Sequence, residues 1–413
     1  MSTKTAAPIS LQRTPKLPVG FRAAGVACGI KAEGKLDLGL LVSDPPTVCA
    51  ATFTTNRIKA SPVRLSMRHL KRGDLRAVVV NSGNANACNG AQGDDDAKAM
   101  AAAAAGALNF DPRQVFVGST GIIGVPLPID KVLSGTPAAA KKLSASGLTS
   151  FSKAILTSDK VNKLASVRVS LGGKTVTVTG AAKGAGMIAP NMATLLAFVV
   201  TDAGISKEEL EAATKEAVAA SFNCISIDGD MSTNDTVLVM ANGAAGNREI
   251  APGSAASRTF RAALSRVMLE LAKKLVRDGE GASKFITIEV VGAGSDKDAR
   301  RIAEAVANSS LVKCSWNGSD PNWGRVIDAV GYAGARIDES KIDISFNGLL
   351  GAKGGVVAET PIAKLKAAVS KREFTVTIGL GIGAGRHTVY TSDLSEGYVA
   401  YNRLEYAFKL QGR

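Results

Sequence analysis

The chain has 413 residues, which is enough for two or three domains of ordinary size. Hydrophobic residues make up 46% of it and charged residues 21%, a balance that favours an ordered globular protein over a disordered one. The longest apolar stretches, such as residues 195–200, are far shorter than the ~20 residues that a membrane helix needs, so a membrane protein is excluded.

The net charge of +14 raises the question of nucleic-acid binding. The densest basic run, 68–76, is interrupted by Asp74, and no aromatic side chains alternate with it. A solvated basic surface that attracts anionic metabolites is the better interpretation, and no nucleic-acid partner is expected. The five cysteines are widely spaced and no secretory signal precedes them, which predicts reduced thiols in a cytoplasmic protein without a zinc site.

Turn-forming residues follow two apolar segments in the first part of the chain. Residues 76–80 are predicted to form a buried strand that runs into an irregular loop at 81–86. The alanine-rich run 97–108 has high helix propensity. Residues 115–117 are predicted to form a second strand, which leads into a loop of small residues at 118–121. Such a loop leaves backbone N–H groups accessible.

A hairpin is predicted over residues 167–179, because Gly172-Gly173 stands between two alternating segments and both glycines tolerate positive φ. A loop of small residues follows at 180–193. Thr194 then opens the apolar run 195–200, which is typical of a central strand.

Helices alternate with strands in the rest of the chain, which predicts an α/β protein. Ser206 and Glu209 form a capping-box pattern at the start of one helix. Helices are predicted at 206–220, 257–277, 296–308 and 362–370. The acidic and glycine-rich stretch that ends near residue 281 predicts a boundary between a larger domain, 1–281, and a smaller C-terminal α/β domain, 282–413.

Several motifs suggest ligands but are incomplete. Residues 29–36 nearly match a phosphate-binding loop, yet Leu36 stands where a Ser or Thr must hold magnesium. The glycines of 379–385 fit a kinked strand better than a dinucleotide site. The acidic stretch 228–235 lacks the spacing of a calcium loop, so no metal is predicted.

The sequence contains two histidines, His69 and His387, which argues against a serine–histidine–acid triad. A threonine can act without imidazole when its own α-amine is the base, which requires cleavage of the chain directly before it. Thr194 fits this requirement, because small Ala193 precedes it and a strand follows it. The alternative interpretation is that Thr194 is simply the first residue of a strand and has no catalytic role.

The segment 183–198 resembles the self-cleavage segment of the ornithine acetyltransferase (glutamate N-acetyltransferase) family of arginine biosynthesis. Further blocks resemble the family in the same order over nearly the whole chain; they are 20–25, 53–56, 81–88, 118–128, 226–236, 277–281 and 320–325. The resemblance implies a layered helix and sheet fold of the self-processing, N-terminal-nucleophile type.

The resemblance also implies roles for individual residues. Autocleavage between Ala193 and Thr194 would free the nucleophile, which would carry an acetyl group from N-acetylornithine to glutamate by a ping-pong route. Thr120 and Gly121 match the family's oxyanion hole. The positions that match substrate contacts are Thr157, Lys183, Thr194, Glu280 and Asn402.

The resemblance implies that the chain's own two fragments associate as a pair, and that two such pairs form a dimer. No bound cofactor is expected, and acetyl-CoA stays open as a second acetyl donor. The tail after Asn402 departs from the family because residues 403–413 contain no Thr. A self-processing amidohydrolase or aminopeptidase of related architecture, in which water resolves the acyl-enzyme, is the alternative function.

Overall fold

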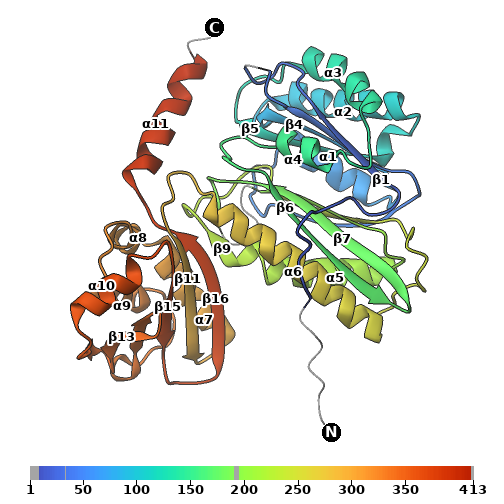
Figure 1. Cartoon of the computed structure of the whole chain (residues 1–413). Helices are drawn as coiled ribbons and strands as arrows, with labels where there is room; N and C mark the ends of the chain where they lie inside the picture. The colour runs from blue at the N-terminus through green and yellow to red at the C-terminus, as the bar shows by residue number, and fades with distance from the viewer. Residues whose placement is uncertain (1–8, 33, 190–194, 411–413) are drawn as a thin grey trace. The chain divides into compact units, whose positions relative to one another are not determined.

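The chain forms two compact units in a computed structural model that describes residues 9–32, 34–189 and 195–410. The first unit comprises the described residues of 1–184, 191–223 and 231–272; the second comprises those of 185–190, 224–230 and 273–413. Each unit combines helices with sheet strands (Figure 1), which confirms the predicted α/β class. The limits 1–281 and 282–413 stay a prediction about independently folding domains.

The first unit is built from two sheets and the helices around them. Its strands are β1 (Phe21–Val26), β2 (Leu38–Ser43), β3 (Val48–Phe53), β4 (Ala77–Asn84), β5 (Val115–Ile122), β6 (Lys163–Leu171), β7 (Lys174–Lys183), β8 (Leu196–Thr201) and β10 (Thr236–Ala241). Its helices are α1 (Ser61–Leu70), α2 (Gly90–Leu108), α3 (Ile129–Lys141), α4 (Leu148–Ala154), α5 (Lys207–Ala219) and most of α6 (Ala255–Arg277).

Two sheets of the first unit share one apolar core. The four-stranded sheet has the order β1-β2-β4-β5, and the five-stranded sheet has the order β3-β10-β8-β7-β6. Val78 and Phe116 of the first sheet pack in one cluster with Phe198 and Leu238 of the second. Helices α2 and α3 cover the other face of the four-stranded sheet, and α6 packs against β7 at Gly180. The predicted layering of helices on sheets is therefore present in this unit.

The strand that follows the predicted cleavage point is central, as the sequence predicts. β8 lies between β7 and β10, and each of its six residues is buried. The hairpin of β6 and β7 turns at Gly172-Gly173, also as predicted. The Ser206 side chain accepts a hydrogen bond from Glu209 N–H at 3.3 Å and caps α5. Ala193 and Thr194 themselves lie outside the described residues.

The prediction of a loop at 118–121 is wrong, and the loop predicted at 81–86 begins only after Asn84. β4 continues to Asn84 and β5 to Ile122, through the turn formers at 81–84 and 118–121. The two strands pair in parallel along these ends, so each supplies hydrogen bonds for the other's backbone. This pairing outweighs the local preference of Asn, Ser and Gly for turns.

The second unit contains one mixed sheet and its own helices. Its strands are β9 (Ile225–Ser226), β11 (Phe285–Ala293), β12 (Asp343–Phe346), β13 (Leu349–Lys353), β14 (Val356–Val357), β15 (Glu373–Gly379) and β16 (Gly385–Ser392). Its helices are α7 (Asp296–Asn308), α8 (Ser310–Asn317), α9 (Trp323–Gly331), α10 (Ile362–Val369) and α11 (Glu396–Leu410). Short 3₁₀ helices of the chain span Pro112–Gln114, Phe222–Cys224 and Glu339–Lys341.

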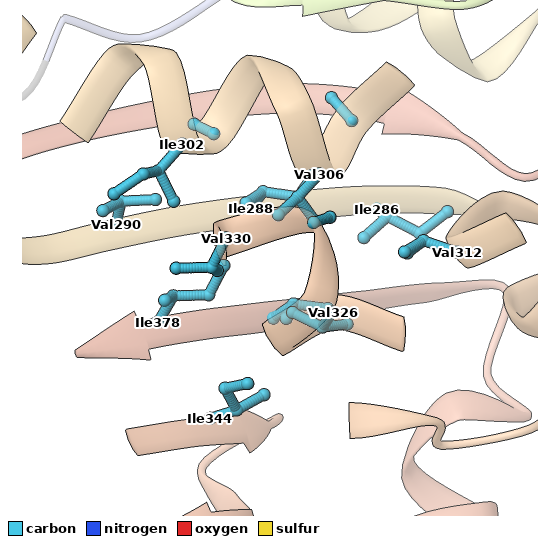
Figure 2. Packing of buried hydrophobic residues seen from close by; sticks show 14 of the residues in the cluster. Ile286, Ile288, Val290, Ile302, Val306, Val312, Val326, Val330, Ile344 and Ile378 are labelled. Carbon is cyan, nitrogen blue, oxygen red and sulfur yellow. The ribbon is translucent and has the colours of Figure 1, made fainter. Parts of the chain in front are cut away.

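Helix α7 supplies much of the core of the second unit. The sheet has the order β14-β13-β12-β15-β11-β16-β9. Figure 2 shows Ile302 and Val306 of α7 facing Ile288 and Val290 of β11, and all four side chains are fully buried. Burying one such side chain contributes about 1.5–3 kcal/mol to folding.

Among the described residues, no helix is both long enough and apolar enough to span a bilayer.

Candidate active site

The paired ends of β4 and β5 place Thr120 and Gly121 at the edge of the four-stranded sheet. Gly83 lies opposite Gly121 in the parallel register. Gly121 has a φ of +139°, and a Cβ at this position would lie 2.3 Å from the carbonyl carbon of Gly83. Only glycine therefore fits here, because the β4 backbone fills the space that a side chain would take. Gly121 is exposed to solvent, as an oxyanion hole that uses its backbone N–H requires.

Lys183 brings two of the other predicted residues together with Thr120. Its Nζ donates to Thr157 Oγ1 at 2.7 Å and to Thr120 Oγ1 at 3.1 Å. The ammonium group is almost fully buried, with 3% of the side chain exposed. Because Thr120 Oγ1 accepts from Lys183, the hydroxyl proton of Thr120 remains available to donate elsewhere.

The strand register also brings Lys183 to the start of β8. Lys183 is the last residue of β7 and pairs with Leu196, which stands two positions after Thr194 in the sequence. Leu195 is fixed as well: its N–H donates to Asp235 Oδ1 at 2.8 Å, and its carbonyl accepts from Thr236 N–H at 3.0 Å. The described chain is thus held firmly from the first residue after Thr194.

Asp159 organises this cluster, although no motif in the sequence singles it out. Its carboxylate accepts from Thr157 N–H at 3.0 Å, from Gly184 N–H at 2.7 Å and from Lys163 Nζ. Lys183 Nζ lies 4.0 Å from Asp159 Oδ2. Burial alone would raise the pKa of Asp159, but the positive charges of Lys183 and Lys163 outweigh burial and hold the pKa at about 2.

A second lysine of the first unit lies near the same cluster. Lys31 Nζ donates to Leu156 O at 2.9 Å, directly before Thr157. Asp37 shapes the loop that carries Lys31 by accepting from the backbone N–H groups of Cys28 and Lys31 at 2.6 and 2.9 Å. Burial lowers the pKa of Lys31 to about 8. The incomplete phosphate-loop pattern of residues 29–36 does not indicate that Lys31 lies beside this cluster.

Glu280 and Asn402, the two predicted contacts of the second unit, touch each other. Asn402 Nδ2 donates to Glu280 Oε2 at 3.1 Å. The Glu280 N–H donates to Ala185 O at 2.7 Å, which ties Glu280 to the segment that follows Lys183. The structure therefore gathers four predicted residues in the first unit and two in the second; they are Thr120, Gly121, Thr157 and Lys183, and then Glu280 and Asn402.

Two acidic side chains of the stretch 228–235, Asp228 and Asp235, accept hydrogen bonds from backbone N–H groups. Asp228 accepts from the N–H groups of Met187 and Ile188 at 2.6 and 2.8 Å within the second unit, and burial raises its pKa. Asp235 holds Leu195 within the first unit. Among the described residues, no group of three or more His, Cys, Asp or Glu side chains is arranged to hold a metal ion.

Comparisons with known proteins cover nearly the full chain. The sequence model of the ArgJ family matches residues 22–406. The arginine biosynthesis bifunctional protein ArgJ of Geobacter sulfurreducens is 48% identical over 384 residues, which are 93% of this chain and 98% of the relative. The protein of the same name from Symbiobacterium thermophilum is 47% identical over 93% of this chain and 96% of its own length.

Among solved structures, a chain of the ornithine acetyltransferase complexed with ornithine from Mycobacterium tuberculosis is 42% identical. The match covers 44% of this chain and 97% of that chain, with a TM-score of 0.41.

The layered α/β fold, its buried lysine and hydroxyl cluster and these relatives together define an enzyme that transfers acyl groups. The chain belongs to the ArgJ family. The predicted acetyltransferase function in arginine biosynthesis is confirmed by these relatives, which do not favour the alternative of an amidohydrolase or aminopeptidase.

Proposed function

We propose that the chain cleaves itself between Ala193 and Thr194 and then transfers acetyl from N-acetylornithine to glutamate through an acetyl-Thr194 enzyme. One observation carries this proposal. Lys183 binds both Thr120 and Thr157 and pairs with Leu196, so groups suited to an oxyanion and to a carboxylate lie at the start of the strand that Thr194 precedes.

Cleavage begins when the Thr194 hydroxyl attacks the carbonyl carbon of Ala193. The C–N bond breaks as the C–O bond forms, and the Thr194 nitrogen takes up a proton. Water then hydrolyses the ester, which releases residues 1–193 with a new carboxyl end and residues 194–413 with a free α-amine. An α-amine has an unperturbed pKa of about 7.7–8.0, so at neutral pH a usable share is unprotonated and can act as the base.

Transfer uses the same hydroxyl in both half-reactions. The Thr194 amine accepts the hydroxyl proton while the oxygen attacks the acetyl carbonyl of N-acetylornithine. The negative charge that develops on the carbonyl oxygen is stabilised by the Gly121 N–H and the free proton of the Thr120 hydroxyl. Ornithine leaves with the proton, and the glutamate amine then attacks the acetyl-Thr194 ester in reverse.

Charge decides how the substrates bind. The buried ammonium of Lys183 suits an α-carboxylate, and the Thr157 hydroxyl beside it supplies a further hydrogen bond. Glu280 suits a substrate amine, and Asn402 orients its carboxylate. The proposed partners are the two fragments, assembled further into a dimer of such pairs in the cytoplasm. The reaction needs no bound cofactor, and acetyl-CoA would enter as an alternative acetyl donor.

A pair of assays tests this function. Purified enzyme is incubated with glutamate and either N-acetylornithine or acetyl-CoA, and N-acetylglutamate is measured in both. Formation of N-acetylglutamate with equimolar ornithine supports the proposed transfer. Release of acetate at the same rate with and without glutamate would make the chain a hydrolase instead. Product from acetyl-CoA would establish the second donor.

Thr120→Val is expected to lower kcat by about 10²–10³-fold with little change in KM, because it removes a hydroxyl aimed at charge that develops during reaction. Steady-state kinetics of the cleaved enzyme measure this. Thr136→Val is the matched control, since Thr136 is buried in α3 and donates to Val132 O. A raised KM with unchanged kcat in Thr120→Val would make Thr120 a ground-state binding residue.

Asn402→Ala is expected to raise the KM for N-acetylornithine about ten-fold, because Glu280 loses a hydrogen bond to a charged group. Self-cleavage should be unchanged, and intact mass together with kinetics separates the two activities. An Asn402→Ala variant with the parent's KM would remove Asn402 from the substrate contacts.

A further inference from the structure

The loop between β1 and β2 carries a lysine that the proposed reaction does not use. Lys31 is half-buried, and its Nζ donates to Leu156 O at 2.9 Å. This bond uses one of the three protons of the ammonium group. The Asp37 carboxylate fixes the backbone of the loop, because its Oδ2 accepts from the N–H groups of Gly29 and Lys31 at 3.1 and 2.9 Å. The loop therefore holds the Lys31 ammonium group at a defined position.

The side chain of Lys31 crosses the end of β4 next to Gly121. A Cβ at Gly83 would lie 3.1 Å from Lys31 Cγ, so the aliphatic part of the lysine packs on the Gly83 backbone. Gly83 lies opposite Gly121 in the parallel register. At its other end, Lys31 binds Leu156, which directly precedes Thr157. Lys31 thus extends from the strand pair that carries Gly121 to the segment that carries Thr157.

Two ammonium groups of different character therefore lie near Thr157. Lys183 is 3% exposed and lies 4.0 Å from Asp159 Oδ2, so a carboxylate already stands beside its charge. Lys31 is half-buried, and burial together with the charge of Lys183 lowers its pKa to about 8 against the opposing charges of Asp37 and Asp159. An anion that binds beside Lys31 would supply a counter-charge and stabilise its protonated form.

The two amino acids of the proposed reaction carry opposite charges on their side chains. Ornithine ends in an amine and glutamate ends in a carboxylate, whereas both share an α-carboxylate. Glu280 suits the ornithine amine but repels the glutamate side chain. The acyl acceptor therefore needs a cation for its second carboxylate, in addition to Lys183, which the shared α-carboxylate occupies.

We propose that Lys31 determines the specificity for the acyl acceptor: its ammonium group binds the side-chain carboxylate of glutamate in the second half-reaction. A half-buried ammonium group forms a strong, charge-assisted hydrogen bond with a carboxylate. The inference rests on the proposed function, and it deepens that function by naming the residue that selects glutamate.

Two substitutions remove the charge in different ways. Lys31→Met keeps an aliphatic side chain to pack on Gly83, and Lys31→Gln keeps an N–H donor for Leu156 O. In a ping-pong reaction, kcat/KM for each substrate reports its own half-reaction. We expect kcat/KM for glutamate to fall about 10–100-fold in both variants, the usual effect of losing a hydrogen bond between charged groups. Exchange of labelled ornithine into N-acetylornithine, measured without glutamate, should be unchanged.

Lys31→Arg and Lys131→Gln are the controls. Lys31→Arg keeps a positive charge and should retain much of the use of glutamate. Lys131 is an exposed lysine of α3 whose Nζ donates to Gly29 O at 2.7 Å, so it contacts the same loop. Lys131→Gln tests whether a weaker hold on this loop is enough to change the kinetics, and we expect it to leave both half-reactions as in the parent.

Cleavage, folding and both half-reactions are measured on each variant by intact mass, thermal unfolding and kinetics. A folded Lys31→Met or Lys31→Gln with the parent's kcat/KM for glutamate overturns the proposal. An equal loss of glutamate use and ornithine exchange also overturns it, because Lys31 would then support the site as a whole. If the parent enzyme itself shows neither ornithine exchange nor formation of N-acetylglutamate, the proposed function fails rather than the assignment of Lys31.

Discussion

Thr194→Ala is expected to give a single chain of 42.4 kDa without acetyl-transfer activity, whereas the parent gives fragments 1–193 and 194–413. The variant lacks the hydroxyl that attacks the Ala193 carbonyl, so no new amine is formed. It therefore loses the nucleophile and the base together. Intact-mass spectrometry and the N-acetylglutamate assay measure both losses on the same sample.

Thr194→Ser is the control, because it keeps the hydroxyl and removes one methyl group. It should cleave, more slowly, and retain activity in proportion to the cleaved share. A stable, uncut parent chain with full activity would contradict the mechanism, since an uncut Thr194 has no free α-amine.

Asp159→Asn is expected to reduce the free energy of unfolding at pH 7 by about 3–5 kcal/mol, the usual cost of breaking a buried ion pair. The Asp159 and Lys163 side chains are both 0% exposed, and Lys183 is 3% exposed. Neutralising the carboxylate removes a negative charge that lies beside two buried ammonium groups. Because Lys183 then shifts, activity should fall as well.

The pH dependence of this effect has a definite sign. The folded pKa of Asp159 is about 2, below the value of about 3.9 for an unfolded Asp. The stabilisation is therefore complete above about pH 4 and is lost as the pH falls toward 2. Urea unfolding at several pH values should show parent and variant converging in acid.

Asp44→Asn provides the comparison for a surface ion pair. Arg22 and Asp44 lie 2.6 Å apart with about half of each side chain exposed, so the substitution should change stability by less than about 1 kcal/mol. An Asp159→Asn variant as stable as Asp44→Asn at pH 7 would show that Asp159 does not balance the two lysines.

Apolar runs and helical periodicity in the sequence correctly predicted several strands and helices. The apolar run at 195–200 became the central strand β8, and the helix predicted at 296–308 became α7. The turn formers at 81–86 and 118–121 were misleading, because β4 and β5 satisfy each other's backbone across a register that no local segment contains. Pairing between distant strands decided the structure at Thr120 and Gly121.

The difference between local sequence patterns and contacts of distant segments also explains which candidate site residues could be identified from the sequence. Thr120, Thr157 and Lys183 were identified through the family resemblance, and the structure brings them into contact. Asp159 stands in an unremarkable Ser-Asp-Lys sequence, and its importance comes from its contacts with Lys163 at the start of β6 and Lys183 at the end of β7. Asp235 lay in a stretch whose acids suggested a cation site, whereas its partner is a backbone N–H far away in sequence.

The central claim is that the acetyl group is carried on Thr194, and mass spectrometry tests it most directly. Cleaved enzyme is mixed with N-acetylornithine in the absence of glutamate, quenched in acid and digested. We predict that the peptide beginning at Thr194 gains the mass of one acetyl group, and that glutamate added before the quench removes it as N-acetylglutamate. An unmodified Thr194 peptide in an enzyme that still transfers acetyl when both substrates are present would contradict the account.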